Sequence, residues 1–205
     1  ISGHGKGPLI LVVHPSLPVK SVAELIAYAK AHPGTLNYGA PIGAPQHLAA
    51  EMLVQSTGVS LVHVPYKGEG PAVTDLVAGQ IHMMFSFPTV AGSFVKTGRL
   101  RGLAVTYDRR IALLPDVPTM REVGLPELEL TAWGAFFAPA GTPRPIIDKL
   151  NAAVVTAMQD AEIQALLRGV GAEAFTTSPE QLADMLKTEM ERWARVVKRS
   201  GVRLD

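Results

Sequence analysis

The stretch Asn37-Tyr-Gly-Ala-Pro-Ile-Gly-Ala-Pro-Gln-His-Leu-Ala-Ala-Glu51 decides how the rest of the chain is interpreted. A short strand from Thr35 to Tyr38 leads into a turn with Gly39 and Gly43, and an amphipathic helix is predicted from about Pro45. Glycines between a strand and a helix let the backbone approach a ligand closely. The helix start adds unpaired N–H groups and the positive end of a dipole, which favour a phosphate or carboxylate. We therefore expect an anion-binding turn here.

Short strands and helices alternate on both sides of this turn. The run from Leu9 to His14 is almost continuously apolar, which is typical of a strand buried on both faces. Ser21 followed by Glu24 fits a capping box, and Pro71 suits the first position of a helix. Further strands are predicted at 60–64, 81–85 and 100–106, and helices at 72–78 and 90–96. This alternation with short turns predicts an α/β fold with parallel strands.

The second half of the chain is mostly helical. Short strands are predicted at 134–138 and 173–175, and helices before Gly124 and at 146–159, 161–169 and 179–200. The last helix carries an apolar stripe made of Leu182, Met185, Leu186, Met190, Trp193 and Val197. Such a stripe needs a sheet to cover, and few predicted strands remain for it. We therefore expect sequence preceding Ile1 to supply part of this region.

Composition narrows the class of protein. The 205 residues are 47% hydrophobic and 18% charged, with a net charge of +1 and pI ≈ 8.2. The lysines and arginines are scattered among acids, which argues against nucleic acid as the main partner. No apolar run approaches the ~20 residues of a membrane span. The absence of cysteine excludes disulfides, thiolate catalysis and cysteine metal sites.

Catalytic and metal-binding patterns are weak. The six histidines form no H-x-x-x-H or H-E-x-x-H spacing, and a capping or buried role is favoured for His47. No G-x-S-x-G elbow is present, and Ser86 is interpreted equally well as a hydrogen-bond donor to a ligand or as chain punctuation. The Gly68-Glu69-Gly70 fragment gives no dinucleotide fingerprint. Small-residue turns at 39–45, 66–71 and 86–89 instead favour a binding protein over an enzyme, with no cofactor or metal.

Motifs along essentially the whole chain resemble Bug-type (TctC-like) substrate-binding proteins of tripartite tricarboxylate transporters. The resemblance rests on segments 11–26, 36–39, 46–51, 62–68, 71–81, 103–106, 114–119 and 137–143, in this order. By this resemblance the start at Ile1 falls well inside the family's mature sequence.

The resemblance implies a two-lobed, type II-like periplasmic binding fold, with parallel-rich sheets and helices on both faces in each lobe. Residues 1–133 would form ligand-binding lobe two with a hinge strand, and 134–205 would return into lobe one, whose N-terminal half is absent. The lobes would close like a Venus flytrap through strands near 7–12 and 132–138.

The family's ligand contacts carry over by position. They are Gly39, Ala40, Gly43, Ala44, Pro45, Gln46, His47, Tyr66, Lys67, Gly68 and Ser86. This chain departs from the family at two places. Ala44-Pro45 replaces Thr-Ser, and Phe85-Ser86-Phe87 replaces Phe-Asp-Asn, so an acid is expected to be missing there. Both departures suggest a less polar ligand, such as a longer or aromatic carboxylate.

The function implied is an extracytoplasmic receptor of the periplasm that binds a small carboxylate by backbone amides. It would deliver the acid to the membrane permease subunits of a tripartite transporter, as a monomer and without nucleic acid. The alternative is a sensor or adaptor that signals to a membrane two-component kinase, since the same site serves both roles. An enzyme using the same cleft is the third reading.

Overall fold

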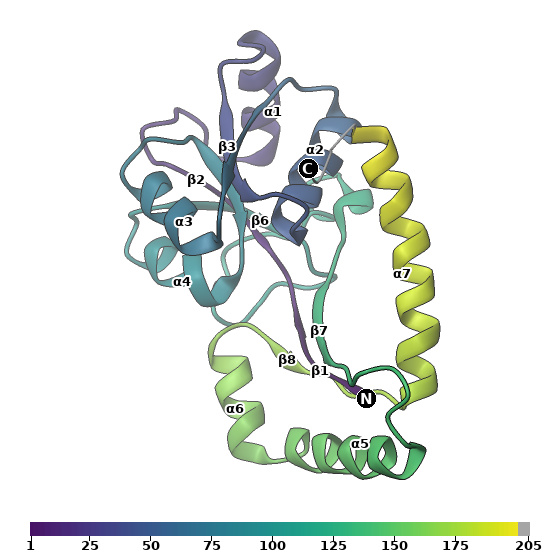
Figure 1. The fold of residues 1–205 in the computed structure, drawn as a ribbon. Coiled ribbons are helices and arrows are strands. Elements are labelled where there is room, and N and C mark those ends of the chain that lie inside the picture. The colour runs from purple at the N-terminus through teal and green to yellow at the C-terminus, as the bar shows by residue number, and fades with distance from the viewer. Residues whose placement is uncertain (201–205) are drawn as a thin grey trace.

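The computed structural model describes the backbone of residues 1–200 and the side chains of residues 1–198. A five-stranded sheet with the order β4-β3-β5-β2-β6 and a three-stranded sheet with the order β7-β1-β8 form its two parts. The larger part stands above the smaller one in Figure 1, and the extended segment β1–β2 runs from one to the other.

The elements follow the predicted alternation closely. The strands are β1 (Ser2–Gly7), β2 (Ile10–Val13), β3 (Asn37–Pro41), β4 (Val62–Tyr66), β5 (Met83–Ser86), β6 (Arg101–Val105), β7 (Ala132–Phe136) and β8 (Glu173–Ala174). The helices are α1 (Val22–Ala31), α2 (Pro45–Thr57), α3 (Glu69–Val77), α4 (Pro88–Lys96), the 3-10 turn η1 (Pro126–Leu128), α5 (Arg144–Met158), α6 (Ala161–Gly169) and α7 (Pro179–Ser200).

Two local predictions are wrong. Helix α3 begins at Glu69 rather than Ala72, so Pro71 is its third residue instead of its first. The residues before Gly124 form turns rather than a short helix. By contrast, Ser21 caps α1 as predicted, because its side chain accepts from the Glu24 amide at 3.1 Å, although the Glu24 carboxylate accepts from the Lys20 amide at 2.6 Å rather than from that of Ser21.

Strand β2 runs antiparallel to its two neighbours, so the prediction of parallel strands is wrong for this strand. β3 pairs in parallel with β4 and β5, whereas β2 is antiparallel to β5 and β6. The reason is that the chain passes directly from β1 in the small sheet into β2. Strand β2 therefore begins at the end of the large sheet that faces the small one. Ile10 at its start therefore pairs with Ser86 and Val105, at the ends of β5 and β6. This topology points the carboxyl ends of the other strands toward the small sheet.

Helices cover both faces of the large sheet, as predicted. All four residues of β2 are buried between two apolar clusters. One cluster includes Leu25 of α1 and Leu53 of α2, and the other includes Leu76 of α3 and Ala91 of α4. The burial on both faces explains why β2 is apolar at every position.

Helix α7 connects the two parts along one side of the molecule (Figure 1). Leu182 near its start is buried, and Trp193 packs against the core of the large sheet. The Gln55 amide of α2 donates to the Val196 carbonyl at 3.4 Å. Between these contacts Met190 stays 64% exposed, so the predicted stripe is only partly covered. Helices α5 and α6 contain no buried residue.

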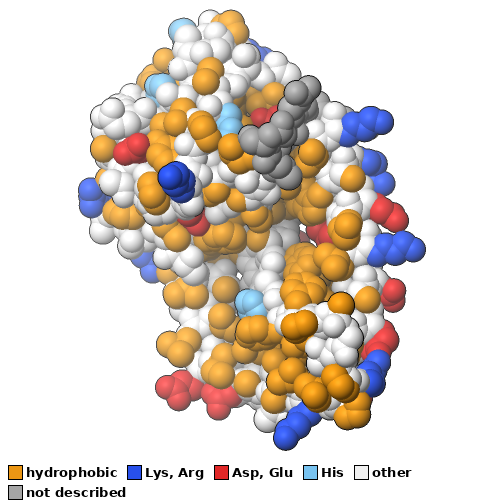
Figure 2. Space-filling view, viewed as in Figure 1, with side chains coloured by type: hydrophobic (Ala, Val, Ile, Leu, Met, Phe, Trp, Pro, Cys, Tyr) orange, Lys and Arg blue, Asp and Glu red, His pale blue; other side chains and the backbone are white. Residues whose placement is uncertain are grey.

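Charged side chains line one side of the visible face. Figure 2 shows Lys, Arg, Asp and Glu along the outer edge of α7, and apolar side chains gathered toward the lower part. Among the helices that the structure describes, none combines the length and the hydropathy that crossing a membrane requires.

Candidate functional site

A cavity of about 330 Å³ lies between the small sheet and the ends of the large-sheet strands. Its wall includes Lys6, Pro45, Phe87, Pro88, Trp133 and Leu167. Figure 2 shows the molecule hollowed between its two parts. The volume and the largely apolar wall are those of a small-molecule site. A second cavity of about 380 Å³ also touches Pro45 and Trp133, so the start of α2 borders both spaces.

The predicted Gly-rich turn is shorter than expected. Strand β3 continues to Pro41, because its parallel pairing with β4 extends as far as Tyr66. Gly39 and Ala40 are therefore buried strand residues, which corrects their assignment to the turn. A Cβ atom at Gly39 would lie 2.4 Å from Ile81 Cδ1, so a larger residue here would force the Ile81 side chain or β3 to shift. Gly43 does belong to the turn, since its φ of 72° lies in the left-handed region.

Part of the turn's hydrogen-bonding capacity is used internally. The Gly43 amide donates to His47 Nδ1 at 3.1 Å, and the Ala44 amide donates to the Pro41 carbonyl at 3.2 Å. The amides of Gln46 and His47 lie in the first turn of α2, where a helix offers no internal acceptor. In the described part of the chain no side chain caps this helix. The start of α2 is thus suited to an anion.

His47 stabilises the turn from its buried side. His47 is only 3% exposed and its ring stacks on His63, which also stacks with the ring of Tyr38. Burial and the neighbouring His63 lower the pKa of His47 to about 4. The neutral ring can therefore keep Nδ1 as the acceptor for the Gly43 amide.

Glu69 is the site residue that the sequence reasoning missed. Its carboxylate accepts from Ser86 Oγ at 2.6 Å, the Phe87 amide at 2.7 Å and Gln46 Nε2 at 3.1 Å. Burial raises the pKa of Glu69, and the three hydrogen bonds oppose that rise. Glu69 thus brings a carboxylate against Ser86, but its hydrogen bonds go to donors of this chain, so the expected loss of an acid from the ligand site stays a prediction. The only sequence signal was an acid within the turn at 66–71.

The other predicted residues lie in different surroundings. Ser86 is fully buried, Lys67 is exposed, and Gly68 precedes the first residue of α3. The Tyr66 hydroxyl donates to Asp75 Oδ2 at 2.7 Å, and burial together with this bond raises the pKa of Tyr66 to about 12. The structure therefore joins Gln46 and Ser86 through Glu69, while the Tyr66 hydroxyl already has a partner.

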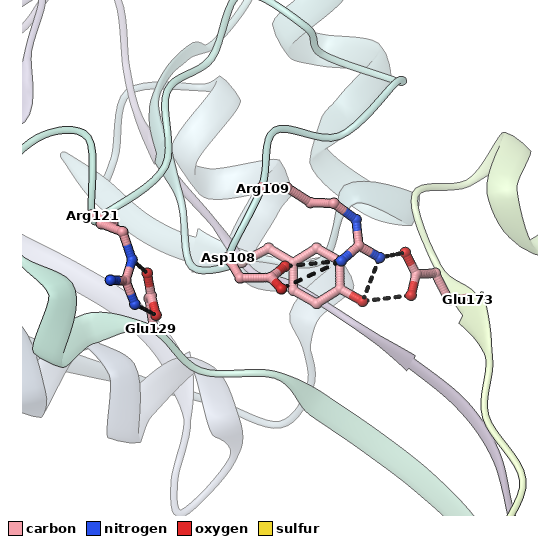
Figure 3. Close-up of polar contacts among 6 residues, drawn as sticks. Asp108, Arg109, Arg121, Glu129 and Glu173 are labelled. Carbon is pink, nitrogen blue, oxygen red and sulfur yellow. Dashed lines mark hydrogen bonds and ion pairs between the residues drawn. The ribbon is translucent and has the colours of Figure 1, made fainter.

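A polar cluster joins the two sheets beside these cavities, and we call it the Tyr107–Arg109–Glu173 clasp (Figure 3). Tyr107 and Arg109 follow β6 of the large sheet, and Glu173 lies in β8 of the small one. The Tyr107 hydroxyl donates to Glu173 Oε2 at 2.6 Å, and Arg109 pairs with Glu173 Oε1. The Arg109 guanidinium also lies 4.5 Å from the centre of the Tyr107 ring. Arg121 and Glu129 form a separate ion pair nearby.

Metal binding has no support in the described residues. Among them, no group of three or more His, Asp or Glu side chains is arranged to hold a metal ion.

Sequence comparison finds a matching family and several relatives of this chain. A family model described as "Tripartite tricarboxylate transporter family receptor" matches residues 1–202. The UPF0065 protein in the tcbD-tcbE intergenic region of Pseudomonas sp. (strain P51) is 38% identical over 93% of this chain and 57% of its own length. Protein BugT of Bordetella pertussis is 35% identical over 100% of this chain and 63% of its own length. The chain thus spans less than two thirds of these relatives.

Solved structures are similar over nearly the whole chain. The R. palustris protein Rpa4515 with adipate is 36% identical, with a TM-score of 0.91, over 98% of this chain and 67% of that one. The periplasmic binding protein BugD is 32% identical, with a TM-score of 0.91, over 99% and 69%. MatC of Rhodopseudomonas palustris with bound malate is 33% identical, with a TM-score of 0.86, over 95% and 68%.

Proposed function

This chain belongs to the tripartite tricarboxylate transporter receptor family, and from that premise we propose that it captures a small organic carboxylate outside the cytoplasm. The receptor would work in the periplasm and deliver the acid to the membrane subunits of a tripartite transporter. The family is one of receptors, and the relevant chemistry is reversible binding rather than turnover.

The observation that carries this proposal is the start of α2. Its first-turn amides have no side-chain cap among the described residues, and Pro45 at its first position lines the apolar cavity. A ligand carboxylate would bind at the amides of Gln46 and His47, and the rest of the ligand would occupy the cavity. Similar proteins with bound adipate and malate support a carboxylate ligand.

Binding would draw the two parts of the molecule together. We propose that residues 1–133 supply one lobe together with a hinge strand, β1, which pairs with β7 in the small sheet, and that residues 134–205 belong to the other lobe. The segments that cross between the sheets, β1–β2 and the chain before β7, would bend as the hinge. A closed, ligand-bound form would then be the form presented to the membrane subunits.

The cavity wall favours a ligand with an apolar body. Phe87, Pro88 and Trp133 offer apolar surface, and the Glu69 carboxylate is not among the residues of this wall. We therefore favour dicarboxylates with a methylene chain, such as adipate, or aromatic carboxylates. Small hydroxy acids such as malate would leave much of this wall uncovered.

A thermal-shift screen of the complete protein tests the proposal. Adipate, malate, benzoate and aspartate would be compared with adipamide, which has the same chain without the charges. A ligand that binds only the folded form raises the melting temperature. We expect adipate or benzoate to raise it and adipamide to have no effect. Equal shifts from adipate and adipamide would refute a carboxylate site, and so would a shift from none of the acids.

A further inference from the structure

Three segments of the large sheet meet at the Glu69 carboxylate. Gln46 is the second residue of α2, Glu69 begins α3, and Ser86 and Phe87 form the turn between β5 and α4. Ser86 is fully buried and Gln46 is 3% exposed, so these hydrogen bonds are largely shielded from water. Charge-assisted hydrogen bonds of this length are stronger than neutral ones.

The chemistry at this position requires a group that can accept hydrogen bonds. Three donors converge here: the Ser86 hydroxyl, the Phe87 amide and the Gln46 Nε2. An ionised carboxylate has two acceptor oxygens and no donor, so it accepts all three without conflict. A hydroxyl or a small apolar side chain at residue 69 could not.

Gln46 shows how strongly Glu69 dictates this arrangement. Its Oε1 is buried without a hydrogen-bond partner among the described residues. Turning the amide over would place Oε1 against the carboxylate, so that two acceptors would face each other. The negative charge of Glu69 therefore fixes the amide orientation even though one oxygen is left without a donor.

We propose that Glu69 is a positioning residue of the ligand site, which fixes the Ser86–Phe87 turn and the first turn of α2 relative to each other. This inference rests on the proposed function, because it concerns the same cavity. Phe87 contributes to the cavity wall and Gln46 belongs to the anion-binding start of α2. Glu69 thus sets the spacing between the subsite for the carboxylate and the subsite for the apolar body.

That spacing determines which acids fit. When the Ser86–Phe87 turn shifts, a ligand that contacts both α2 and Phe87 loses one contact, whereas a shorter ligand keeps its carboxylate contact. Loss of Glu69 should therefore weaken adipate binding more than malate binding.

Substitution by glutamine separates position from charge. In Glu69→Gln, Oε1 can still accept from Ser86 and Phe87, and Nε2 can donate to Gln46 once the Gln46 amide turns over. The network then survives without the charge. Glu69→Ala removes all three bonds. Glu127→Ala removes an exposed glutamate elsewhere and is the matched control.

The first experiment needs no ligand. In ¹H–¹⁵N spectra of the complete protein, Glu69→Ala should move the amide resonance of Phe87 and the side-chain NH₂ of Gln46. Glu69→Gln should leave the amide signals of residues 89 and 90 near their wild-type positions, and Glu127→Ala should change none of these signals. An unmoved Phe87 amide in Glu69→Ala would overturn the positioning role, whether or not any acid binds.

The second experiment measures adipate and malate binding by calorimetry. Each variant is measured at a temperature equally far below its own melting temperature. Glu69→Ala should weaken adipate binding by about tenfold or more and malate binding by less, as expected for a lost contact in a buried site. Glu69→Gln should restore adipate binding. Equal adipate affinity in wild type and Glu69→Ala would overturn this inference and leave the proposed function intact. If wild type bound neither acid, the aliphatic form of the proposed function would fail, and the spectra would still decide the role of Glu69.

Discussion

His47 and His63 stack face to face, with ring centroids 4.0 Å apart and an angle of 17° between the planes. His63 Nε2 is 2.9 Å from the Ala40 carbonyl, and His47 Nδ1 accepts from the Gly43 amide. Glu51 Oε1 lies 3.9 Å from His47 Nε2 and already accepts from the Tyr38 hydroxyl. The stack therefore connects β3, β4 and the start of α2.

This stack predicts a loss of stability in acid. The pKa of His47 is about 4 in the folded protein, against an ordinary value of 6.5. Between these pH values the unfolded chain binds more protons, so the free energy of unfolding falls as pH falls from 6.5 to 4. Each unit of pKa difference corresponds to about 1.4 kcal/mol. In His47→Asn, Oδ1 can accept from Gly43 without titrating, so the melting temperature should fall less over this range.

Thermal unfolding from pH 7 to pH 4 checks this prediction. His32→Asn, at an exposed histidine after α1, is the control and should keep the wild-type slope. An unchanged slope in His47→Asn would show that other groups cause the acid sensitivity.

Substitution of Gly39 by alanine is expected to cause a packing defect. In Gly39→Ala the new Cβ would lie 2.4 Å from Ile81 Cδ1 and 3.0 Å from Tyr66 Cε2, which overfills a buried site. Overpacking costs about 1–3 kcal/mol of the free energy of unfolding, measurable in urea. Ile81→Val removes Cδ1, so the double variant should recover part of the loss.

Gly70→Ala is the matched control for this substitution. Its Cβ would meet nothing within 4 Å, and alanine suits a helix better than glycine, so stability should be equal or slightly higher. If Gly39→Ala were as stable as Gly70→Ala, the Ile81 side chain or the backbone of β3 would be free to move aside.

These examples show what the sequence could predict. The α/β binding-protein fold is confirmed by the likeness to solved structures, and Pro45 correctly marked the start of α2. Local patterns such as apolar runs, capping residues and helix-starting prolines carry this information. The end of β3 was predicted too early because Gly39 resembles a turn residue, while its real constraint, Ile81, is 42 positions away in the chain.

Strand direction and Glu69 depended on contacts between distant residues. A β-α pattern does not reveal that β2 runs in the opposite direction to β5, since a strand of either direction buries the same apolar residues. Likewise, an acid between two glycines has no local feature that identifies Ser86 as its partner. Only the parallel packing of β3 between β4 and β5 brings these segments together.

The Tyr107–Arg109–Glu173 clasp predicts a stability change with a defined pH dependence. Burial alone would raise the pKa of Glu173, but the hydrogen bonds from Tyr107 and Arg109 outweigh it and the pKa is lowered. The clasp therefore stabilises the protein above the ordinary pKa of a glutamate and loses this effect as pH falls through the lowered value. Tyr107→Phe should cost about 1 kcal/mol near pH 7 and less in acid.

Denaturant unfolding of Tyr107→Phe at pH 7 and pH 3 measures this difference. Tyr28→Phe is the control, because the Tyr28 hydroxyl makes no hydrogen bond within the described residues. A pH-independent cost for Tyr107→Phe would mean that its bond to Glu173 contributes little and that packing of the ring dominates.

The start of α2 offers the sharpest test of the anion site. Ala44 occupies the N-cap position with extended backbone angles, φ −72° and ψ 160°, so an acceptor placed there can bond the first-turn amides. Ala44→Asn and Ala44→Asp should both stabilise the ligand-free protein by about 0.5–2 kcal/mol.

The aspartate also places a negative charge where the ligand carboxylate is proposed to bind. Adipate binding should therefore weaken moderately in Ala44→Asn and by about tenfold or more in Ala44→Asp, because like charges repel. Calorimetric titration of both variants, compared with their melting temperatures, separates capping from repulsion. Wild-type affinity in Ala44→Asp would place the ligand carboxylate elsewhere in the cleft.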